Sequence, residues 1–400
     1  MIPLETLRAR TQAMSPWLTD VRRDFHMHPE LGGRETRTSA KVQEYLREMG
    51  VECAPLPGST AVVGLIRGGQ EGPTVAIRAD MDALPIQETN DKPYRSTCDG
   101  VMHACGHDAH TTILLGTAKL FAPLRAELPG NLKLLFQPAE ETTGGAEDMV
   151  RAGCMKNPDV DYCIGLHVMA GTPVGQVEMK YGAMNGASDT AEIIIRGKKS
   201  HGAYPELGTD AVAIAAQVVT ALQTLVSRNV SPLDSAVLTV GSIHGGIQGN
   251  IVADEVKMLA AVRTIRPATR QLMRSRITAV AQGVSRAMGG DAEVVIHAGY
   301  KALINSDKVV DVALEAAREL VGPENIRMRD QPSLGVEDFS YFLDAAPGAF
   351  YHLGCANAAK GITSAGHTAT FDIDESCLPL GVLLHARTAL RLMEERPAAR

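Results

Sequence analysis

The stretch Thr74-Val-Ala-Ile-Arg-Ala-Asp-Met-Asp-Ala-Leu-Pro85 begins as an apolar run and ends in two carboxylates. A short apolar run of this kind is typical of a buried strand. Helical spacing precedes it and stops at Gly50, and a second helical pattern follows at 110–121. Because strands and helices alternate in this way, the sequence predicts an α/β domain whose core sheet is mostly parallel.

The pattern changes near Gly182, and 400 residues are more than one domain usually carries. The elements that follow are long helices and strands with half-exposed alternation, predicted at 189–196, 210–227, 236–240, 255–263, 268–288 and 293–297. Their β-α-β-β-α-β order is that of a ferredoxin-like α+β unit. We therefore expect a satellite domain at residues 183–298, inserted into a catalytic domain made of residues 1–182 and 299–400. A helix at 337–343 and a closing helix at 376–393 are predicted in the returning segment.

Composition excludes several classes of function. The chain is 45% hydrophobic and 21% charged, which is typical of a globular protein. Its net charge is −7 and no long basic run is present, so neither nucleic acid nor an anionic membrane is an expected partner. No stretch approaches 18 continuous apolar residues, and Met1–Arg10 lacks the apolar core of a signal peptide. Seven scattered cysteines do not form a disulfide framework, which predicts a reduced, cytoplasmic chain.

Polar residues with no obvious packing role follow the predicted strands of the first domain. They lie in Arg78–Pro85, His103–His110, Phe136–Gly145 and Gly165–His167, and a later polar segment is Ser364–Thr368. Since α/β domains keep their sites at strand ends, we expect these loops to converge in space.

Two of these loops carry the chemistry of a metal site. Cys105 and His107 are separated by Gly106, so both side chains can point at one atom. Cysteine, histidine and glutamate are ligands of divalent transition metals, and the adjacent Glu140 and Glu141 can divide the roles of base and ligand. Each element alone also fits a structural role, such as a packed thiol or a solvated glutamate pair. Together they predict a metal-dependent hydrolase.

Seven motifs in order carry a family resemblance along nearly the whole chain. They are Phe25-His-Met-His-Pro-Glu-Leu-Gly32, Arg78-Ala-Asp-Met-Asp-Ala-Leu-Pro85, Met102-His-Ala-Cys-Gly-His-Asp-Ala-His110, Gln137-Pro-Ala-Glu-Glu141, Gly165-Leu-His167, Gly335-Val-Glu-Asp-Phe339 and Ala365-Gly-His-Thr368. The sequence resembles the metal-dependent N-acyl-amino-acid amidohydrolases of the hippurate hydrolase and indole-acetyl-amino-acid hydrolase type, a branch of the dinuclear aminoacylase and carboxypeptidase family. The resemblance implies two divalent metal ions, zinc or manganese. It also implies a homodimer or larger homo-oligomer formed through the ferredoxin-like domain.

The resemblance assigns roles in the catalytic domain residue by residue. The implied metal ligands are Cys105, His107, Glu141, His167 and His367. Glu140 would be the general base acting on a metal-bound water, and Asp82 would orient a ligand from behind. Asp80 stands where other branches have a histidine ligand, so its direct ligation is not implied. His103 and His110 flank the ligand loop without an assigned role, and an orienting role behind the ligands stays open for both, as does direct contact of His110 with metal.

The satellite domain is also given roles by the resemblance. His201 would stabilise the oxyanion in the partner subunit's site, although Lys199-Ser200 replaces the usual Gly-Gly before it. Asn250 and Arg263 would hold the substrate's α-carboxylate. The implied reaction on this small-molecule substrate is hydrolysis of an N-acyl-L-amino acid to a carboxylate and a free amino acid. The alternatives are a dipeptidase or carboxypeptidase, an N-acetyl-diaminopimelate-type deacetylase, or a non-catalytic binding protein.

Overall fold

The computed structural model describes residues 2–395, which divide into two compact units. The larger unit comprises the described residues up to Gly182, Ile304–Gln331 and those from Asp338 onward. The smaller unit comprises Ala183–Leu303 and Pro332–Glu337. The chain leaves the larger unit through β7 (Gly182–Asn185) and returns through β14 (Leu303–Asn305).

The larger unit is built on one eight-stranded sheet in the order β1-β2-β4-β3-β5-β16-β6-β15. Its strands are β1 (Glu52–Pro55), β2 (Val62–Ile66), β3 (Thr74–Asp80), β4 (Asn131–Gln137), β5 (Tyr162–Pro173), β6 (Val177–Met179), β15 (Ile326–Met328) and β16 (Gly348–Ala356). The four central strands, β4, β3, β5 and β16, run parallel, whereas β1 and β2 pair antiparallel at one edge. Every residue of β3 is buried, including the charged Arg78 and Asp80, as expected for a central strand covered on both faces.

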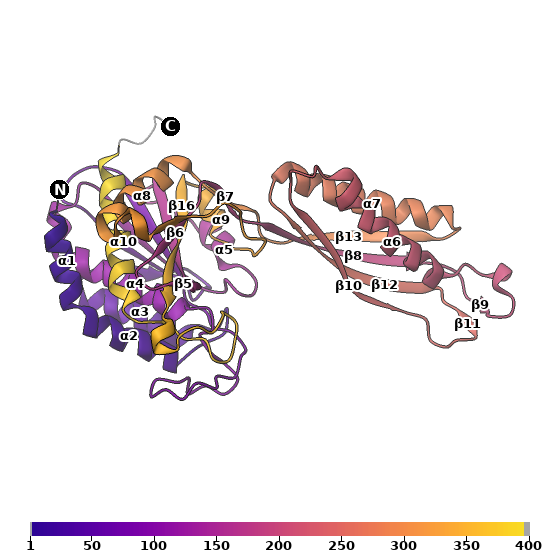
Figure 1. Cartoon of the computed structure of the whole chain (residues 1–400), viewed down its shortest axis with the longest axis horizontal. Coiled ribbons are helices and arrows are strands. Elements are labelled where there is room, and N and C mark those ends of the chain that lie inside the picture. The colour runs from indigo at the N-terminus through magenta and orange to yellow at the C-terminus, as the bar shows by residue number, and fades with distance from the viewer. Residues whose placement is uncertain (1, 396–400) are drawn as a thin grey trace. The chain divides into compact units, whose positions relative to one another are not determined.

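The helices of the larger unit either contact strands of this sheet or pack on the helices that do (Figure 1). They are α1 (Leu4–Ala13), α2 (Ser15–Met27), α3 (Thr36–Glu48), α4 (His107–Phe121), α5 (Gly145–Arg151), α8 (Asp307–Val321), α9 (Ser340–Leu343) and α10 (Cys377–Glu394). Val75 and Ile77 of β3, Ile113 of α4 and Val382 of α10 belong to one buried apolar cluster. The predicted α/β class with a parallel core is confirmed.

One predicted helix is shorter in the structure. Helical structure was expected from residue 337, but α9 begins at Ser340. The carboxylate of Asp338 instead accepts hydrogen bonds from Arg78 and Gln137 in the buried sheet. This tertiary contact accounts for the later helix start, because it holds Asp338 in a loop outside the helix.

The smaller unit is an antiparallel four-stranded sheet with two helices packed against it (Figure 1). Its elements are β8 (Ala187–Arg196), α6 (Ala211–Asn229), β10 (Ala236–Gly245), β12 (Glu255–Thr264), α7 (Pro267–Ala287) and β13 (Asp291–Ala298), with β9 (Ser200–His201) and β11 (Ile251–Val252) forming a separate small pair. The strand order is β10-β12-β8-β13. Buried and exposed residues alternate along β12, so one face of the sheet forms the core.

Helix α6 is long and apolar enough to cross a membrane by length and composition alone. Its buried side chains, including Ile214, Val218 and Leu222, belong to the apolar core of the smaller unit. Asp210 caps its first turn by accepting hydrogen bonds from the backbone N–H groups of Val212 and Ala213. Amphipathic packing therefore explains this helix without a membrane.

Candidate metal centre

The predicted ligand loops meet at the carboxyl ends of the central strands. Asp80 ends β3 directly beside Gln137 at the end of β4, so the loops that follow these strands begin side by side. His167 lies on the neighbouring strand β5, and Gly106 immediately precedes α4. Parallel strands thus deliver residues from distant parts of the sequence to one edge of the sheet, as expected for an α/β domain.

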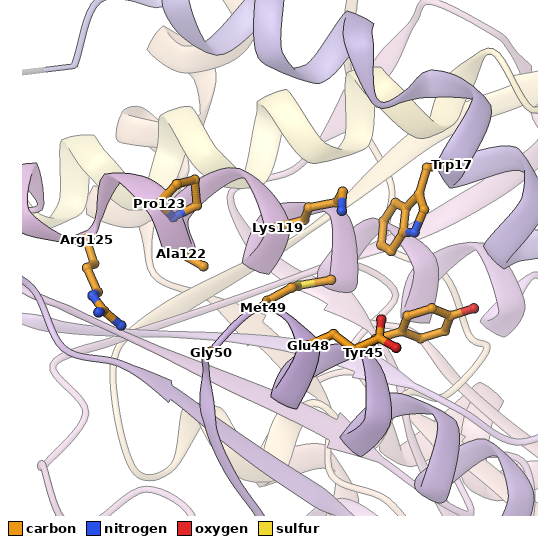
Figure 2. A pocket seen from close by; sticks show the side chains of 9 residues that line it. All are labelled: Trp17, Tyr45, Glu48, Met49, Gly50, Lys119, Ala122, Pro123 and Arg125. Atoms are coloured by element: carbon orange, nitrogen blue, oxygen red, sulfur yellow. The ribbon is translucent and has the colours of Figure 1, made fainter.

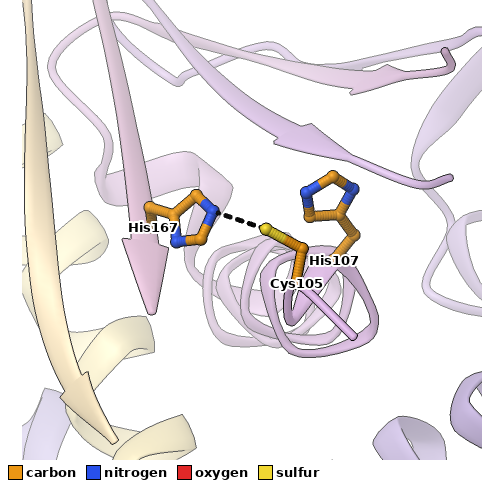
Figure 3. A group of neighbouring side chains, drawn as sticks. All are labelled: Cys105, His107 and His167. Atoms are coloured by element: carbon orange, nitrogen blue, oxygen red, sulfur yellow. Dashed lines mark hydrogen bonds between the residues drawn. The ribbon is translucent and has the colours of Figure 1, made fainter. Parts of the chain in front are cut away.

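Five side chains gather closely at this edge. The Sγ atom of Cys105 lies 3.3 Å from Nε2 of His167 and 3.3 Å from Nε2 of His367. Nε2 of His367 lies 3.1 Å from Oε1 of Glu141, and Nε2 of His107 lies 3.9 Å from the same oxygen. Figure 3 shows Cys105 and His167 pointing toward one another, with His107 beside them. The structure therefore brings together all five predicted ligands.

The ligand loop depends on a glycine between Cys105 and His107. Gly106 has a φ of +91°, which favours glycine. A Cβ atom there would lie 2.3 Å from Cγ2 of Val168, so a larger residue would collide with the strand that carries His167. Gly106 therefore permits both the turn and the close approach of the two ligand segments.

Glu140 and Glu141 lie in a loop that is held by the buried carboxylate of Glu35, a residue outside the quoted motifs. Ala139 precedes the pair with a φ of +58°, an uncommon conformation for a residue other than glycine. Its backbone N–H donates to Oε1 of Glu35, which is completely buried. Glu140 itself is buried, and its carboxylate belongs to a group with His107 and Glu141 whose ligand atoms all lie within 4.8 Å of one another.

Hydrogen bonds to the rings set the tautomers of two predicted ligands. Nδ1 of His167 donates to the backbone carbonyl of Val168 at 2.7 Å, and Nδ1 of His107 donates to Oδ1 of Asp82 at 3.1 Å. Each ring therefore turns its Nε2 toward the cluster. The other oxygen of Asp82 accepts from the backbone N–H of Glu141 at 3.0 Å. Asp82 thus contacts both segments, as an orienting carboxylate should.

A buried atom with no partner shows that these residues fit a cation. Among residues 2–395, Nε2 of His107 is buried without any hydrogen-bond partner. Such an atom is costly in a folded protein unless something else satisfies it. Thiol, imidazole and carboxylate together form a donor set for a divalent transition metal, and the ring nitrogen points at the other donors.

The charges of the cluster also suit a cation. Burial raises the pKa of the Cys105 thiol, so the thiol holds its proton near neutral pH. Burial also opposes ionisation of Glu141, but His367 and His107 outweigh it and lower the pKa of Glu141 to about 2. Burial lowers the pKa of His107, whereas Asp80 and Asp82 raise it and prevail. A metal must therefore displace protons from the site when it binds.

Behind the cluster lies a buried network of residues whose roles the motifs did not reveal. Arg78 donates to Oδ2 of Asp80 at 2.7 Å and to Oδ1 of Asp338 at 2.9 Å. Gln137 donates to Asp338 as well. Arg78, Gln137 and Asp338 all lie in the quoted motifs, but the motifs give no sign that these residues bond to one another. The network fixes the end of β3 beneath the ligand loops.

The predicted residues of the smaller unit fall into two places. His201 is exposed on β9, and the backbone carbonyl of Asn250 accepts a hydrogen bond from Gly202 next to it. Arg263 lies opposite Ser188, at the end of β12 farthest from β11. Arg263 lies eight positions beyond Glu255 along that strand, a distance of about 26 Å. Within one chain, the structure therefore groups His201 with Asn250 but not with Arg263.

A separate hollow of about 460 Å³ lies elsewhere on the larger unit (Figure 2). Trp17, Tyr45, Met49, Lys119 and Arg125 are among the residues that line it. The Lys119 ammonium lies 4.7 Å from the centre of the Trp17 ring. No predicted ligand lines this hollow, which is therefore distinct from the cluster of predicted ligands.

A parallel-core α/β unit that gathers thiol, imidazole and carboxylate at its strand ends is the architecture of a metal-dependent hydrolase. The model of peptidase family M20/M25/M40 matches residues 76–391, and the chain belongs to this family. The predicted family relationship and enzyme class are confirmed.

Relatives with assigned names cover almost the whole chain. An IAA-amino acid hydrolase of Arabidopsis thaliana is 38% identical, covering 96% of this chain and 87% of that protein. A hippurate hydrolase of Campylobacter jejuni is 36% identical, covering 94% and 96%. A thermostable carboxypeptidase of Saccharolobus solfataricus is also 36% identical, covering 97% and 98%.

Solved structures agree with this relationship. A putative aminohydrolase from methicillin-resistant Staphylococcus aureus has a TM-score of 0.93 at 31% identity, covering 98% of this chain and all of that one. A Bacillus subtilis protein described as a dinuclear metal binding peptidase of the M20 family has a TM-score of 0.84 at 33% identity, covering 96% and 99%.

Proposed function

We propose that this hydrolase cleaves the amide bond of N-acyl-L-amino acids to give a carboxylate and a free amino acid. The observation that carries the proposal is the buried Glu140, whose carboxylate lies within 4.8 Å of the ligand atoms of His107 and Glu141. The names of the hippurate and IAA-amino acid hydrolases support the substrate class.

We propose that two divalent ions, zinc or manganese, occupy the cluster. The ligands would be Cys105, His107, Glu141, His167 and His367. Five donors exceed the four of a single tetrahedral zinc site, and the B. subtilis neighbour is described as dinuclear. When bound, the ions would polarise the amide carbonyl and acidify a water molecule.

The protein's own groups then move the protons. Glu140 would take a proton from the attacking water and pass it to the leaving amine nitrogen. Its loop is fixed by the hydrogen bond from Ala139 to Glu35, so the carboxylate is held in place before the reaction. The imidazole of His201 from a second subunit would stabilise the oxyanion, and Asn250 and Arg263 would hold the substrate's α-carboxylate.

A homodimer would explain how His201 and Arg263, which lie far apart within one chain, could serve the same kind of site. Strand β10 is an end strand of the described four-stranded sheet. Apart from Arg228 in its last turn, the outward face of the neighbouring α6 exposes uncharged residues, among them Ala213, Ala216, Gln217, Thr220, Gln223 and Thr224. An open strand edge beside an uncharged helix face suits contact with a second copy.

A charge on this helix face should separate the subunits. We expect Ala216→Glu to sediment as a monomer and to lose most activity, because each site would lack His201 from the other subunit. Sedimentation velocity and initial rates measure the two effects. Ala9→Glu, at an exposed position of α1, is the matched control and should remain dimeric. A wild-type protein that sediments as a monomer with full activity would contradict the dimer.

The substrate class is tested with enzyme reconstituted separately with zinc, manganese and cobalt. Hydrolysis of N-acetyl- and N-benzoyl-amino acids is compared with hydrolysis of dipeptides and longer peptides. We expect kcat/KM to be highest for an N-acyl amino acid. The similarity to a carboxypeptidase makes peptide cleavage the specific alternative, and a higher kcat/KM for peptides would favour it.

We also propose that the enzyme works in the cytoplasm. All seven cysteines are free thiols in the structure. Disulfides are rare in reducing compartments, where free thiols persist.

A further inference from the structure

His110 is a buried histidine that the proposed mechanism does not use. It lies on α4 three residues after His107, so the two rings share one face of the helix. Only 1% of its surface is exposed. Its ring packs edge-on against that of His167, with the ring centres 4.6 Å apart. A proposed ligand therefore lies on either side of it.

Both ring nitrogens of His110 are occupied by the protein. The backbone N–H of Val168 donates to Nε2 at 2.8 Å, so Nε2 must carry a lone pair. Nδ1 must then carry the proton of the neutral ring, and it lies 2.6 Å from Oδ1 of Asp80. His110 can therefore offer no lone pair to a cation without losing its bond to Val168.

Asp80, which bonds to His110, is itself held by further hydrogen bonds. Its Oδ2 accepts from Arg78, and its backbone carbonyl accepts from the Thr111 hydroxyl at 2.8 Å. Because Arg78 is fixed in turn by Gln137 and Asp338, the carboxylate of Asp80 cannot rotate freely. Asp80 thus provides a rigid anchor for the His110 ring.

On its other side, His110 is linked through Val168 to His167, a proposed metal ligand. Val168 donates its N–H to His110, and its carbonyl accepts the Nδ1–H of His167. The hydrogen bond to His110 thus holds Val168 in place, and the carbonyl of Val168 in turn fixes the orientation of the His167 ring. That ring presents Nε2 to Cys105 Sγ at 3.3 Å.

We propose that His110, anchored by Asp80, is a positioning residue that holds Val168 so that His167 presents Nε2 to a metal ion. This inference rests on the proposed ligand role of His167. It also gives Asp80 a function in place of ligation: the carboxylate anchors a histidine instead of binding the ion.

Two isosteric variants separate the two hydrogen bonds of the ring. In His110→Gln, the amide oxygen can take the place of Nε2 and accept from Val168. In His110→Asn, the amide nitrogen can take the place of Nδ1 and donate to Asp80, but the acceptor for Val168 is lost. We expect His110→Asn to weaken zinc binding about 10- to 100-fold, the usual effect of losing such a partner. His110→Gln keeps an acceptor for Val168 but loses the bond to Asp80, so its loss of zinc affinity should be smaller than that of His110→Asn.

Zinc affinity is measured by competition with a chromophoric chelator, and the visible absorption of the cobalt-loaded protein reports ligand geometry. His385→Asn controls for the loss of a buried imidazole, because His385 is equally buried but bonds to Tyr351. It should leave the affinity and the cobalt spectrum unchanged. Wild-type affinity in His110→Asn, or an equal loss in both His110 variants, would overturn the proposal.

The hydrogen bond itself is tested in metal-free wild-type protein, which does not depend on the folding of a variant. ¹⁵N chemical shifts should show the proton of His110 on Nδ1, and the Val168 amide should exchange slowly. A proton on Nε2 would overturn the proposal. These readouts and zinc affinity are independent of turnover, so tight zinc binding without hydrolysis of N-acyl amino acids would remove the proposed function and leave the role of His110 intact.

Discussion

Glutamine in place of Glu140 should lower kcat by about 10²- to 10⁴-fold, the usual contribution of a general base. The substitution keeps the size of the side chain and removes its ability to accept a proton. Glu140 is not among the five proposed ligands, so the metal content should remain that of wild type. Turnover with saturating substrate and elemental analysis of the same preparation measure the two effects together.

The control for this variant is Glu147→Gln on α5. Glu147 is exposed and forms a surface pair with Arg151, so its replacement should leave kcat unchanged. Near-normal turnover in Glu140→Gln would remove the assignment of the base. Loss of metal from that variant would instead make Glu140 a ligand.

Alanine in place of Cys105 should abolish activity through loss of metal. The thiol contacts both His167 and His367, so no other side chain can supply its contacts to both rings. Elemental analysis after gel filtration should show clearly less than the wild-type metal content. Cys98→Ala, at a half-buried free thiol outside the cluster, should retain metal and activity. Full metal content in Cys105→Ala would show that the thiol is not a ligand.

Metal binding should also depend on pH through this thiol. Because burial raises the pKa of Cys105, the thiol is protonated at pH 7 before the metal binds, and the thiolate is the form that ligates. Binding therefore releases its proton, and the apparent affinity should fall as the pH is lowered. Calorimetry in buffers of different ionisation enthalpy counts the protons. Cys98→Ala, whose thiol lies outside the cluster, should release as many protons as wild type.

Much of the site could be predicted from local sequence. Apolar runs such as Thr74–Ile77 indicated strands, and the polar segments after them indicated the edge at which a site would form. The adjacent pairs Cys105 with His107 and Glu140 with Glu141 carry their chemistry in their spacing. The parallel sheet then brings these loops together, because the carboxyl ends of neighbouring parallel strands share one edge.

The contacts that support the site could not be read in the same way. Arg78 and Asp338 are 260 residues apart, and Glu35 lies 104 residues from the Ala139 amide that it holds. Nothing local in the sequence distinguishes such a carboxylate from one on the surface. The separation of Arg263 from His201 likewise depends on tertiary pairing, because His201 pairs with β11, whereas Arg263 lies at the far end of β12.

The amino-acid sequence alone determined the α/β class and the family, and it predicted the types of ligand, because strand periodicity, loop position and donor chemistry are properties of neighbouring residues. Only the tertiary structure decided that Asp80 binds Arg78 and His110, and that the Nε2 atoms of His107 and His167 face the cluster. The physical reason is that a buried polar group takes its state from the partners that folding places within hydrogen-bond distance, and those partners come from remote segments of the chain.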